Sequence, residues 1–498
     1  MNLRYCCAVL LALSACSKNS SSGSSSGAGS SSGAGSSSGS SGGASSGSSS
    51  GAQAAAVHSF AWANTQTTSS VSESEALAMA ADAAGVIVAG DVDGTPQASL
   101  TRYDTTGAVK WSLVADPNGG AASSITSVLS VTNSSCNGLG TPATCVFITG
   151  TFVNGLQLGD PLNGGITFVQ AGECGFVAML TDGGTSPSLM WSKYITPTAG
   201  QVVPTSLAFG SFGGLLVTGS LTGHADFGSG ASVSVDLPSP GGIFVAAFSA
   251  VTGNEQWAQI PGAAGSQLLP DSFTNSTLNA GAWLAADANH NVYLAVAADP
   301  ANPGSPSTNP TGNGVVILNK YSETAWGISV TPTWTAAPNT VGPASVSVGG
   351  VAVDSNGDVI MLGSTGKSAL KFSSALALTT DSFIAKFGAA TGAVVWASGY
   401  SANEHVALAV DGTTSYAFAN STNPGNVPIG TGVPMGIFKF DSAGVQQALI
   451  IAGGLNAKAQ SIASHEGTIY VSGIFDQPGT FGTLAVATSG VFTAQLVK

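Results

Sequence analysis

Three short hydrophobic patterns recur in a fixed order along most of the chain. The first is an apolar pair, an Asp, a turn and a β-branched run that ends in Gly, as at residues 81–90 and 353–363. The second is an apolar strand with alternating small residues, as at 382–387, and the third is a Gly turn before a Trp strand, as at 391–396. Short β-branched and aromatic runs bounded by Gly and Asp predict strands. The whole pattern therefore predicts an all-β protein.

The three patterns divide this part of the chain into seven predicted units. Their starts lie near residues 74, 123, 203, 278, 348, 405 and 459. Each unit offers about four strands: one before the Asp turn, one after it, the Phe strand and the Trp strand. A unit of roughly 60 residues is slightly longer than the roughly 40–50 of common propeller blades. Because radial repetition hides the edges of four-stranded sheets, we predict a seven-bladed β-propeller over residues 57–498.

One Trp strand has no unit of its own. The last unit ends at Lys498 without a Trp strand, whereas residues 58–63, which include Trp62, have no unit before them. We expect the Trp62 strand to complete the last blade, so that an N-terminal strand closes the propeller. The alternative is that Trp62 is a core aromatic of a leading strand. An open solenoid would expose both ends and need caps.

The first 15 residues predict a signal peptide. Arg4 precedes an apolar run at 5–13, which is shorter than the roughly 20 residues that span a bilayer. Residues 13–16, Leu-Ser-Ala-Cys, resemble the bacterial lipobox. The resemblance implies cleavage before Cys16 and acylation of its thiol and new amine, which gives stable anchoring because each buried CH₂ contributes about 0.8 kcal/mol. Ser17, in place of an Asp that marks inner-membrane retention, favours the outer membrane, while an ordinary secretory signal with a chance Cys is the alternative.

Residues 16–56 contain the lipidated Cys and then almost only Ser, Gly and Ala. Such a segment has nothing apolar to bury, so we expect a disordered tether. About 40 residues of flexible chain have a root-mean-square span of about 35 Å. The tether would hold the folded domain away from a membrane.

The composition of the chain excludes some classes of binding partner. Charged residues make up 7% of the chain and the net charge is −13, so a basic footprint for nucleic acid is absent. Anionic lipid surfaces would repel this charge, and no further apolar run is long enough to span a bilayer. We therefore expect membrane contact only through the N-terminal lipid, and a monomer that takes a protein or glycan ligand.

Three cysteines remain after Cys6 and Cys7 leave with the signal and Cys16 takes lipid. Cys136 and Cys145 flank a turn-rich loop in an exported, oxidising context, so we expect a disulfide between them. Two free or differently paired thiols are the alternative. Cys174 is then left without a second Cys to pair with. We expect its side chain to act as a small buried hydrophobic group, with a reactive thiol as the minor alternative.

The repeat resembles the bacterial β-propeller repeats often described as SBBP-type. Residues 351–398 carry the resemblance best, and Phe227-Gly228 and Phe481-Gly482 are similar to that family's Phe-Gly turn within a blade. The resemblance covers most of residues 57–498 and implies a fold and a surface location, but no catalytic residues.

The Thr-Gly-x-x-x-Trp element also resembles quinoprotein repeats, which occur in dehydrogenases and in outer-membrane assembly lipoproteins. The vicinal Cys pair expected of the dehydrogenases is present only as Cys6-Cys7, within the signal.

Residues with catalytic or metal chemistry are scattered. The five His do not lie at ligand spacing; they are His58, His224, His290, His405 and His465. We expect His224 and His290 to lie in solvated turns. Asp354, Asn356 and Asp358 place oxygen ligands at alternate positions, which suits calcium, but Asp and Asn before Gly also form tight turns unaided. We therefore expect no cofactor, with calcium as the weaker alternative.

The repeated Trp and Phe residues are best explained as packing between blades. An aromatic platform for sugars is the alternative, with Tyr400 and Trp326 as candidates. The leading hypothesis is a cell-envelope lipoprotein, periplasmic or surface-exposed, whose propeller is a non-catalytic binding or scaffolding module. The rivals are an exported hydrolase or lyase on the same scaffold and an outer-membrane assembly factor.

Overall fold

A computed structural model describes most of the chain after residue 59. The described ranges are 60–66, 75–91, 97–115, 123–133, 143–159, 165–228, 234–261, 283–298, 313–325, 327–329, 331–343, 346–365, 368–400, 402–420, 435–454, 457–475, 479–481, 484–486 and 490–496. All of them belong to one compact unit, Ala54–Lys498. The predicted signal peptide, Cys16 and the predicted tether lie outside the described residues.

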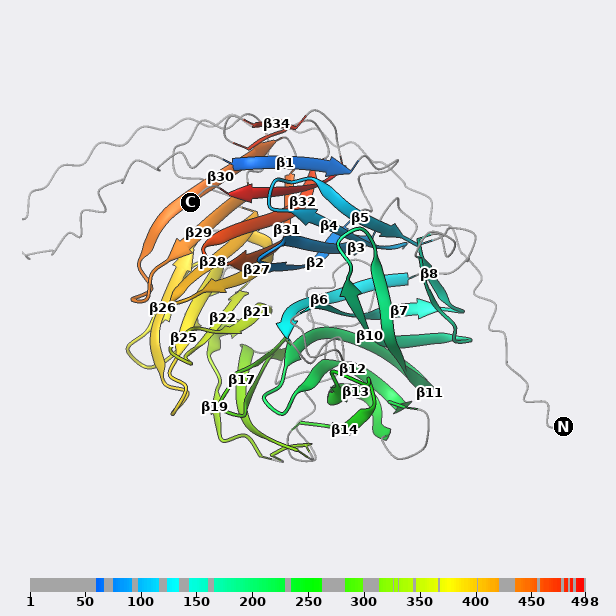
Figure 1. Ribbon diagram of the computed structural model, residues 1–498. Helices are drawn as coiled ribbons and strands as arrows, with labels where there is room; N and C mark the ends of the chain where they lie inside the picture. Colours follow the sequence, from blue (N-terminus) through cyan, green and yellow to red (C-terminus); the bar gives the residue numbers. More distant parts are fainter. Residues whose placement is uncertain are drawn as a thin grey trace, which may run out of the picture. The chain divides into compact units, whose positions relative to one another are not determined.

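The described residues form strands and turns without any helix, so the all-β prediction is confirmed. No helix among them could cross a bilayer. The strands build antiparallel sheets of successive neighbours, as Figure 1 shows. Sheet A contains β2 (Glu75–Asp82), β3 (Gly85–Asp91), β4 (Ala98–Asp104) and β5 (Val109–Val114).

Sheets B and C share one long strand. Sheet B contains β6 (Ser123–Asn133), β7 (Ala143–Val153), β10 (Glu173–Asp182) and the first part of β11 (Pro187–Phe209). Sheet C contains the second part of β11, then β12 (Gly214–Asp226), β13 (Ser234–Ser249) and β14 (Glu255–Gln259). Residues 187–195 of β11 pair with β10, and residues from Thr196 onward pair with β12.

The later sheets follow the same order. Sheet D contains β15 (Trp283–Ala286), β16 (Asn291–Ala298), β17 (Asn313–Thr324) and β19 (Trp334–Ala336), with β18 (Gly327–Ile328) also on β17. Sheet E contains β21 (Ser347–Val353), β22 (Val359–Ser364), β25 (Ser382–Phe387) and β26 (Val394–Tyr400). Sheet F contains β27 (Asn403–Asp411), β28 (Thr414–Asn420), β29 (Met435–Phe440) and β30 (Gln446–Gly454).

Sheet G takes strands from both ends of the described chain. It contains β31 (Ala457–His465), β32 (Thr468–Phe475), β35 (Gly490–Leu496) and β1 (Phe60–Gln66). β1 pairs antiparallel with β35, with Phe60 opposite Leu496 and Gln66 opposite Val491. The Trp62 strand is thus the fourth strand of the last sheet.

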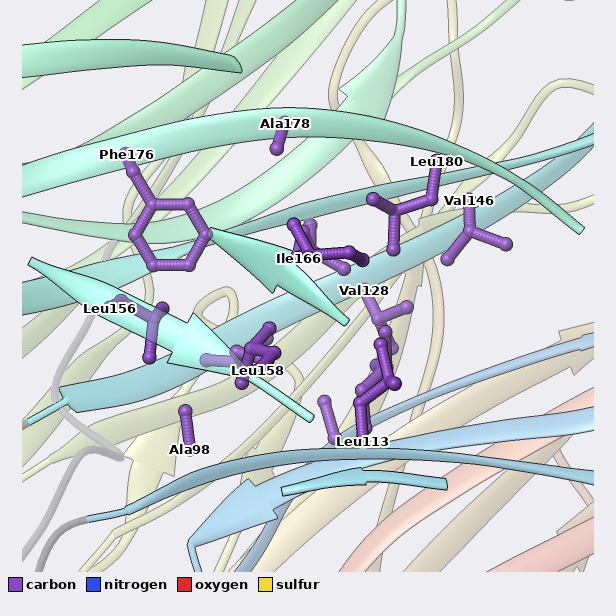
Figure 2. Close-up of a cluster of buried hydrophobic side chains, with 14 of the residues drawn as sticks. Ala98, Leu113, Val128, Val146, Leu156, Leu158, Ile166, Phe176, Ala178 and Leu180 are labelled. Atoms are coloured by element: carbon purple, nitrogen blue, oxygen red, sulfur yellow. The ribbon is translucent and has the colours of Figure 1, made fainter. Parts of the chain in front are cut away.

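The first strand of each sheet contacts the first strand of the next. β2 contacts β6, β6 contacts β11, β11 contacts β15, β15 contacts β21, β21 contacts β27 and β27 contacts β31. β31 in turn contacts β2. Between neighbouring sheets lie buried apolar clusters, one of which Figure 2 shows between sheets A and B, where Leu113 faces Val128 and Val146.

Both faces of each sheet are buried, which explains the apolar runs of the sequence. In β3, Val86 and Val88 belong to the cluster shared with sheet G, whereas Ile87 and Ala89 belong to the cluster shared with sheet B. Alternate residues of a strand point to opposite faces. A strand that is covered on both faces must therefore be apolar at nearly every position.

Most fourth strands of the sheets carry a Trp that reaches the next sheet. Trp191 of sheet B donates its indole N–H to the Ala250 carbonyl of sheet C at 3.1 Å, and Trp334 of sheet D donates to Ala389 of sheet E at 3.0 Å. Each indole also lies against the hairpin Gly of that next sheet: a Cβ built on Gly253 would be 2.5 Å from the Trp191 ring. The two Trp residues thus pack between neighbouring sheets, as expected of the repeated Trp.

Candidate functional site

In each sheet the antiparallel order places the hairpins after the first and third strands at one end, and the connection after the second strand at the other. We call these the hairpin end and the insertion end. Extra strands lie in the insertion-end connections: β8 (Leu156–Leu158) with β9 (Ile166–Phe168), β23 (Leu370–Lys371) with β24 (Ala377–Leu378), and β33 (Gly479–Phe481) with β34 (Leu484–Val486).

The insertions connect neighbouring sheets. β33 pairs with β30 of sheet F, although it lies in a connection of sheet G. β23 pairs with β20 (Asn339–Pro343), which also pairs with β17 of sheet D. Leu158 forms a bridge with Ala115, just after sheet A. Each insertion thus extends the backbone hydrogen bonding from its own sheet to the preceding one.

The Phe-Gly turns also belong to this end. Phe227 is buried and lies edge-on against Phe244, with ring centroids 5.0 Å apart. Two other Phe residues of insertion-end connections make similar contacts without a following Gly: Phe372 lies edge-on against Phe383 at 5.7 Å, and Phe168 is tilted against Phe176 at 5.0 Å. In each pair the second Phe begins the apolar core of a third strand, so the insertion packs on its own sheet.

At the hairpin end of sheet E, the candidate calcium residues form a turn and an ion-pair network. The Asp354 carboxylate accepts the backbone N–H groups of Asn356 at 2.9 Å and of Asp358 at 3.0 Å. The Lys386 ammonium contacts Asp354 at 2.6 Å and Asp358 at 2.9 Å. Burial alone would lower the pKa of Lys386, but these two carboxylates outweigh burial and raise it.

Sheet A has the corresponding arrangement with Arg instead of Lys. The Arg102 guanidinium, itself buried, pairs with Asp82 and lies 3.4 Å from an oxygen of Asp182 in sheet B. Ser130 of sheet B donates to Asp82 at 2.6 Å. Burial would raise the pKa of Asp82, but the Arg102 and Ser130 hydrogen bonds hold it below its usual range. The network therefore fastens the hairpin ends of sheets A and B.

A third polar contact joins sheets C and D at the same end. The Ser211 hydroxyl lies 2.9 Å from the Glu323 carboxylate and 2.5 Å from Nδ1 of His290. The Ser211 backbone N–H donates to the same Glu323 oxygen at 3.0 Å. These residues are 79 and 112 positions apart in sequence, so no motif spacing could have revealed them.

The described residues contain no group of three or more His, Cys, Asp or Glu side chains placed to hold a metal ion. Asp354 and Asp358 share the Lys386 ammonium, and Asn356 contacts Asp354 through its backbone N–H. In this arrangement the carboxylates of Asp354 and Asp358 neutralise the buried Lys386 ammonium and hold the β21–β22 hairpin in place.

The other predicted residues have mixed outcomes. Cys174 is a fully buried free thiol in the cluster between sheets A and B, as predicted, and burial raises its pKa to about 12. Cys145 is buried in β7, while Cys136 lies outside the described residues, so their pairing stays a prediction.

The turn predicted for His224 was wrong, and one candidate of the alternative sugar platform is excluded. His224 lies within β12 rather than in a turn, because β11, β12 and β13 continue beyond the core of sheet C. Tyr400 is only 3% exposed and packs on Phe438 with ring centroids 4.6 Å apart, so it cannot be an open platform for sugars. Trp326 lies outside the described residues. His290 does lie in a turn, as predicted.

Known proteins resemble the chain only distantly. No family model matches the sequence, and no curated protein does. BamB from Moraxella catarrhalis is 12% identical, with 89% of this chain and 98% of that chain covered at a TM-score of 0.36. Quinohemoprotein alcohol dehydrogenase from Comamonas testosteroni is 11% identical, with 88% and 76% covered at a TM-score of 0.37. At such low identities and TM-scores, neither a shared fold nor a shared function follows for this chain.

Proposed function

We propose that the protein is a cell-envelope lipoprotein that presents a seven-bladed β-propeller as a non-catalytic binding or scaffolding module. Sheets A to G would be the blades. The succession of contacts from β2 through β6, β11, β15, β21, β27 and β31 back to β2 supports a closed ring. The pairing of β1 with β35 supports closure by the N-terminal strand.

The position of the insertions is the observation that carries the binding role. At the hairpin ends of sheets A and E, the Arg102 and Lys386 networks pair their charges with one another. The insertion end carries extra strands that differ from one sheet to the next. Val169, which directly follows β9, is 76% exposed there. Variable loops on a rigid scaffold are where binding residues concentrate.

Site-specific photocrosslinking in cells tests this role. A photoreactive amino acid at Val169 reports on the insertion end, and the same residue at Val251, 49% exposed in the hairpin of sheet C, is the matched control. We expect covalent adducts with an envelope protein or glycan from position 169 and none from position 251. Adducts from position 251 alone, or from neither position, would contradict the proposal.

We further propose that Cys16 is lipidated and that residues 16–56 are the tether of the domain. The Leu-Ser-Ala-Cys sequence and the Ser/Gly/Ala run that follows support this. Metabolic labelling with a palmitate analogue should mark the wild-type protein and not Cys16→Ala. An unlabelled wild type, or normal processing of Cys16→Ala, would exclude lipidation. The Ser17 position supports the outer membrane as the site of anchoring.

A second candidate function, hydrolysis, is favoured only by the contact between Ser211 and His290. A serine nucleophile needs a base that takes its proton. Here the Ser211 hydroxyl donates to the Glu323 carboxylate, and among the described residues no carboxylate forms a hydrogen bond or ion pair with the His290 ring. The geometry therefore favours a structural contact. An outer-membrane assembly factor, the third candidate, would co-purify with barrel-assembly components.

A further inference from the structure

The first hairpin of sheet C lacks a side chain that the corresponding hairpins of sheets A, D and E carry. In those three sheets an Asp carboxylate at or just after the end of the first strand accepts the backbone N–H two residues further on, which closes the turn. The three residues are Asp82, Asp287 and Asp354, with N···O distances of 2.8, 2.8 and 2.9 Å. Gly210 holds this place in sheet C, because its N–H donates to the Gly214 carbonyl at 2.8 Å, as that of Asp354 donates to Asp358 at 2.9 Å.

A carboxylate from sheet D fills the place of the missing Asp. Glu323 lies in β17, and its backbone N–H donates to the His290 carbonyl at 2.7 Å. Its carboxylate crosses to sheet C, where it accepts the Ser211 backbone N–H at 3.0 Å and the Ser211 hydroxyl at 2.9 Å. A Cβ built on Gly210 would overlap a Glu323 carboxylate oxygen. The absence of a side chain at Gly210 therefore leaves the space that Glu323 occupies.

Two further contacts join the same pair of hairpins. The Ser211 hydroxyl lies 2.5 Å from Nδ1 of His290, and the Phe212 ring packs on the imidazole with centroids 4.4 Å apart. His290 has a φ of 61°, a left-handed conformation that strains residues other than Gly. Contacts from sheet C therefore hold the hairpin of sheet D, just as Glu323 of sheet D holds the hairpin of sheet C.

Burial makes the contact between Glu323 and Ser211 costly to break. Glu323 is 6% exposed, and among the described side chains no Lys or Arg forms an ion pair with it. A buried carboxylate is unfavourable unless it accepts hydrogen bonds, and Ser211 donates two of them. If the hairpin of sheet C moved away, Glu323 would lose both donors and the Ser211 N–H would lose its acceptor.

We propose that Glu323 closes the β11–β12 hairpin from the neighbouring sheet, so that sheets C and D form a conformational interlock at the hairpin end. A hairpin with its own Asp keeps its closing hydrogen bond when the next sheet moves. The hairpin of sheet C loses that bond as soon as the contact with sheet D opens. The hairpin at 209–214 and the end of β17 therefore open together, as one local unit.

Moving the carboxylate from sheet D to sheet C tests the interlock. Amide hydrogen exchange, measured by mass spectrometry, should be on the order of tenfold faster at 209–214 in Glu323→Ala. Gly210→Asp alone should also exchange faster there, because two carboxylates would compete for one space. The double variant again has a single carboxylate, now within the hairpin, and should regain protection. The hairpin at 354–358, which has Asp354, is the internal control and should not change.

Unchanged exchange at 209–214 in Glu323→Ala would overturn the proposal, and so would a double variant that is no better protected than Glu323→Ala. A second measurement needs no variant. In the wild-type protein, exchange at 209–214 and at 320–324 should rise with the same dependence on low concentrations of denaturant, because the two segments open together. Different dependences for the two segments would show that the hairpin opens without sheet D and would equally overturn the interlock.

Discussion

The indole of Trp62 lies against the backbone of Gly107, so that a Cβ built on Gly107 would come within 2.5 Å of the ring. The indole N–H donates to the Thr105 carbonyl at 3.2 Å, and the Asn64 amide donates to the Gly107 carbonyl. Trp62 belongs to β1 of sheet G and Gly107 to the β4–β5 hairpin of sheet A. The first described strand thus fixes the contact between the last sheet and the first.

Gly107→Ala should destabilise the protein by about 2–4 kcal/mol, because positive φ strain adds to a clash with a packed indole. Gly184→Ala is the matched control: Gly184 has φ 84°, close to the 87° of Gly107, but nothing lies within 4 Å of its Cβ position. We expect it to lose only about 1 kcal/mol. Denaturant unfolding measures both, and equal losses would show that Trp62 does not restrict the site.

Arg102→Met should cost about 3–5 kcal/mol, since it leaves the buried Asp82 carboxylate without its cation. Lys110→Met is the control, because Lys110 is half exposed and pairs with Asp104 at the surface at 3.2 Å. Exposed pairs contribute about 0–1 kcal/mol. If the two variants unfold at the same denaturant concentration, the network around Arg102 does not hold sheets A and B together.

Asp82 should contribute to acid unfolding. Its pKa is held below the ordinary value of 3.8 in the folded state, so its contribution is complete above that value and is lost as the pH falls through the lower, folded pKa. Stability measured from about pH 5 to about pH 2 should therefore fall less steeply in Asp82→Asn than in the wild type. Parallel curves would contradict this assignment.

Cys174 should resist alkylation while the protein is folded, because a thiol with its pKa raised to about 12 carries almost no thiolate near neutral pH. A soluble form that begins after Cys16 should take up iodoacetamide once only after denaturation, and three times after denaturation with reductant. Intact mass reads both results. Three additions without reductant would exclude the predicted disulfide between Cys136 and Cys145.

Periodicity located much of the fold. Strands begin at Glu75, Ser123, Ser347, Asn403 and Ala457, within two residues of the predicted unit starts there. This works because both faces of each sheet are apolar and each turn carries its own Asp or Gly. The orphan Trp62 was informative for the same reason, since its sequence matches the fourth strand of a unit.

The fourth strand of sheet F carries no Trp, and the order of strands in sheet G explains why. Ala448 is paired with Lys439 in sheet F, as Trp396 is with Lys386 in sheet E. The third and fourth strands of the next sheet, G, come from opposite ends of the described chain and are not joined by a hairpin. There is then no hairpin Gly to receive an indole from sheet F.

Other features of the fold could not be predicted from neighbouring residues in the sequence. The shared strand β11 has no turn between its two halves, although pairing changes from β10 to β12 near Thr196. Ser211, His290 and Glu323 come from three distant segments, so their meeting depends on how sheets C and D pack. Tyr400 looked like a loop aromatic because burial depends on Phe438 of the next sheet.

The pairing of β1 with β35 has a consequence for how the protein is made. A chain synthesised from its N-terminus delivers β1 first and β35 last among the described strands. Until then the backbone of β1 lacks the strand with which it pairs in sheet G. A prematurely ended chain would keep that unpaired strand permanently, so cellular proteases could remove incomplete copies without any dedicated recognition signal.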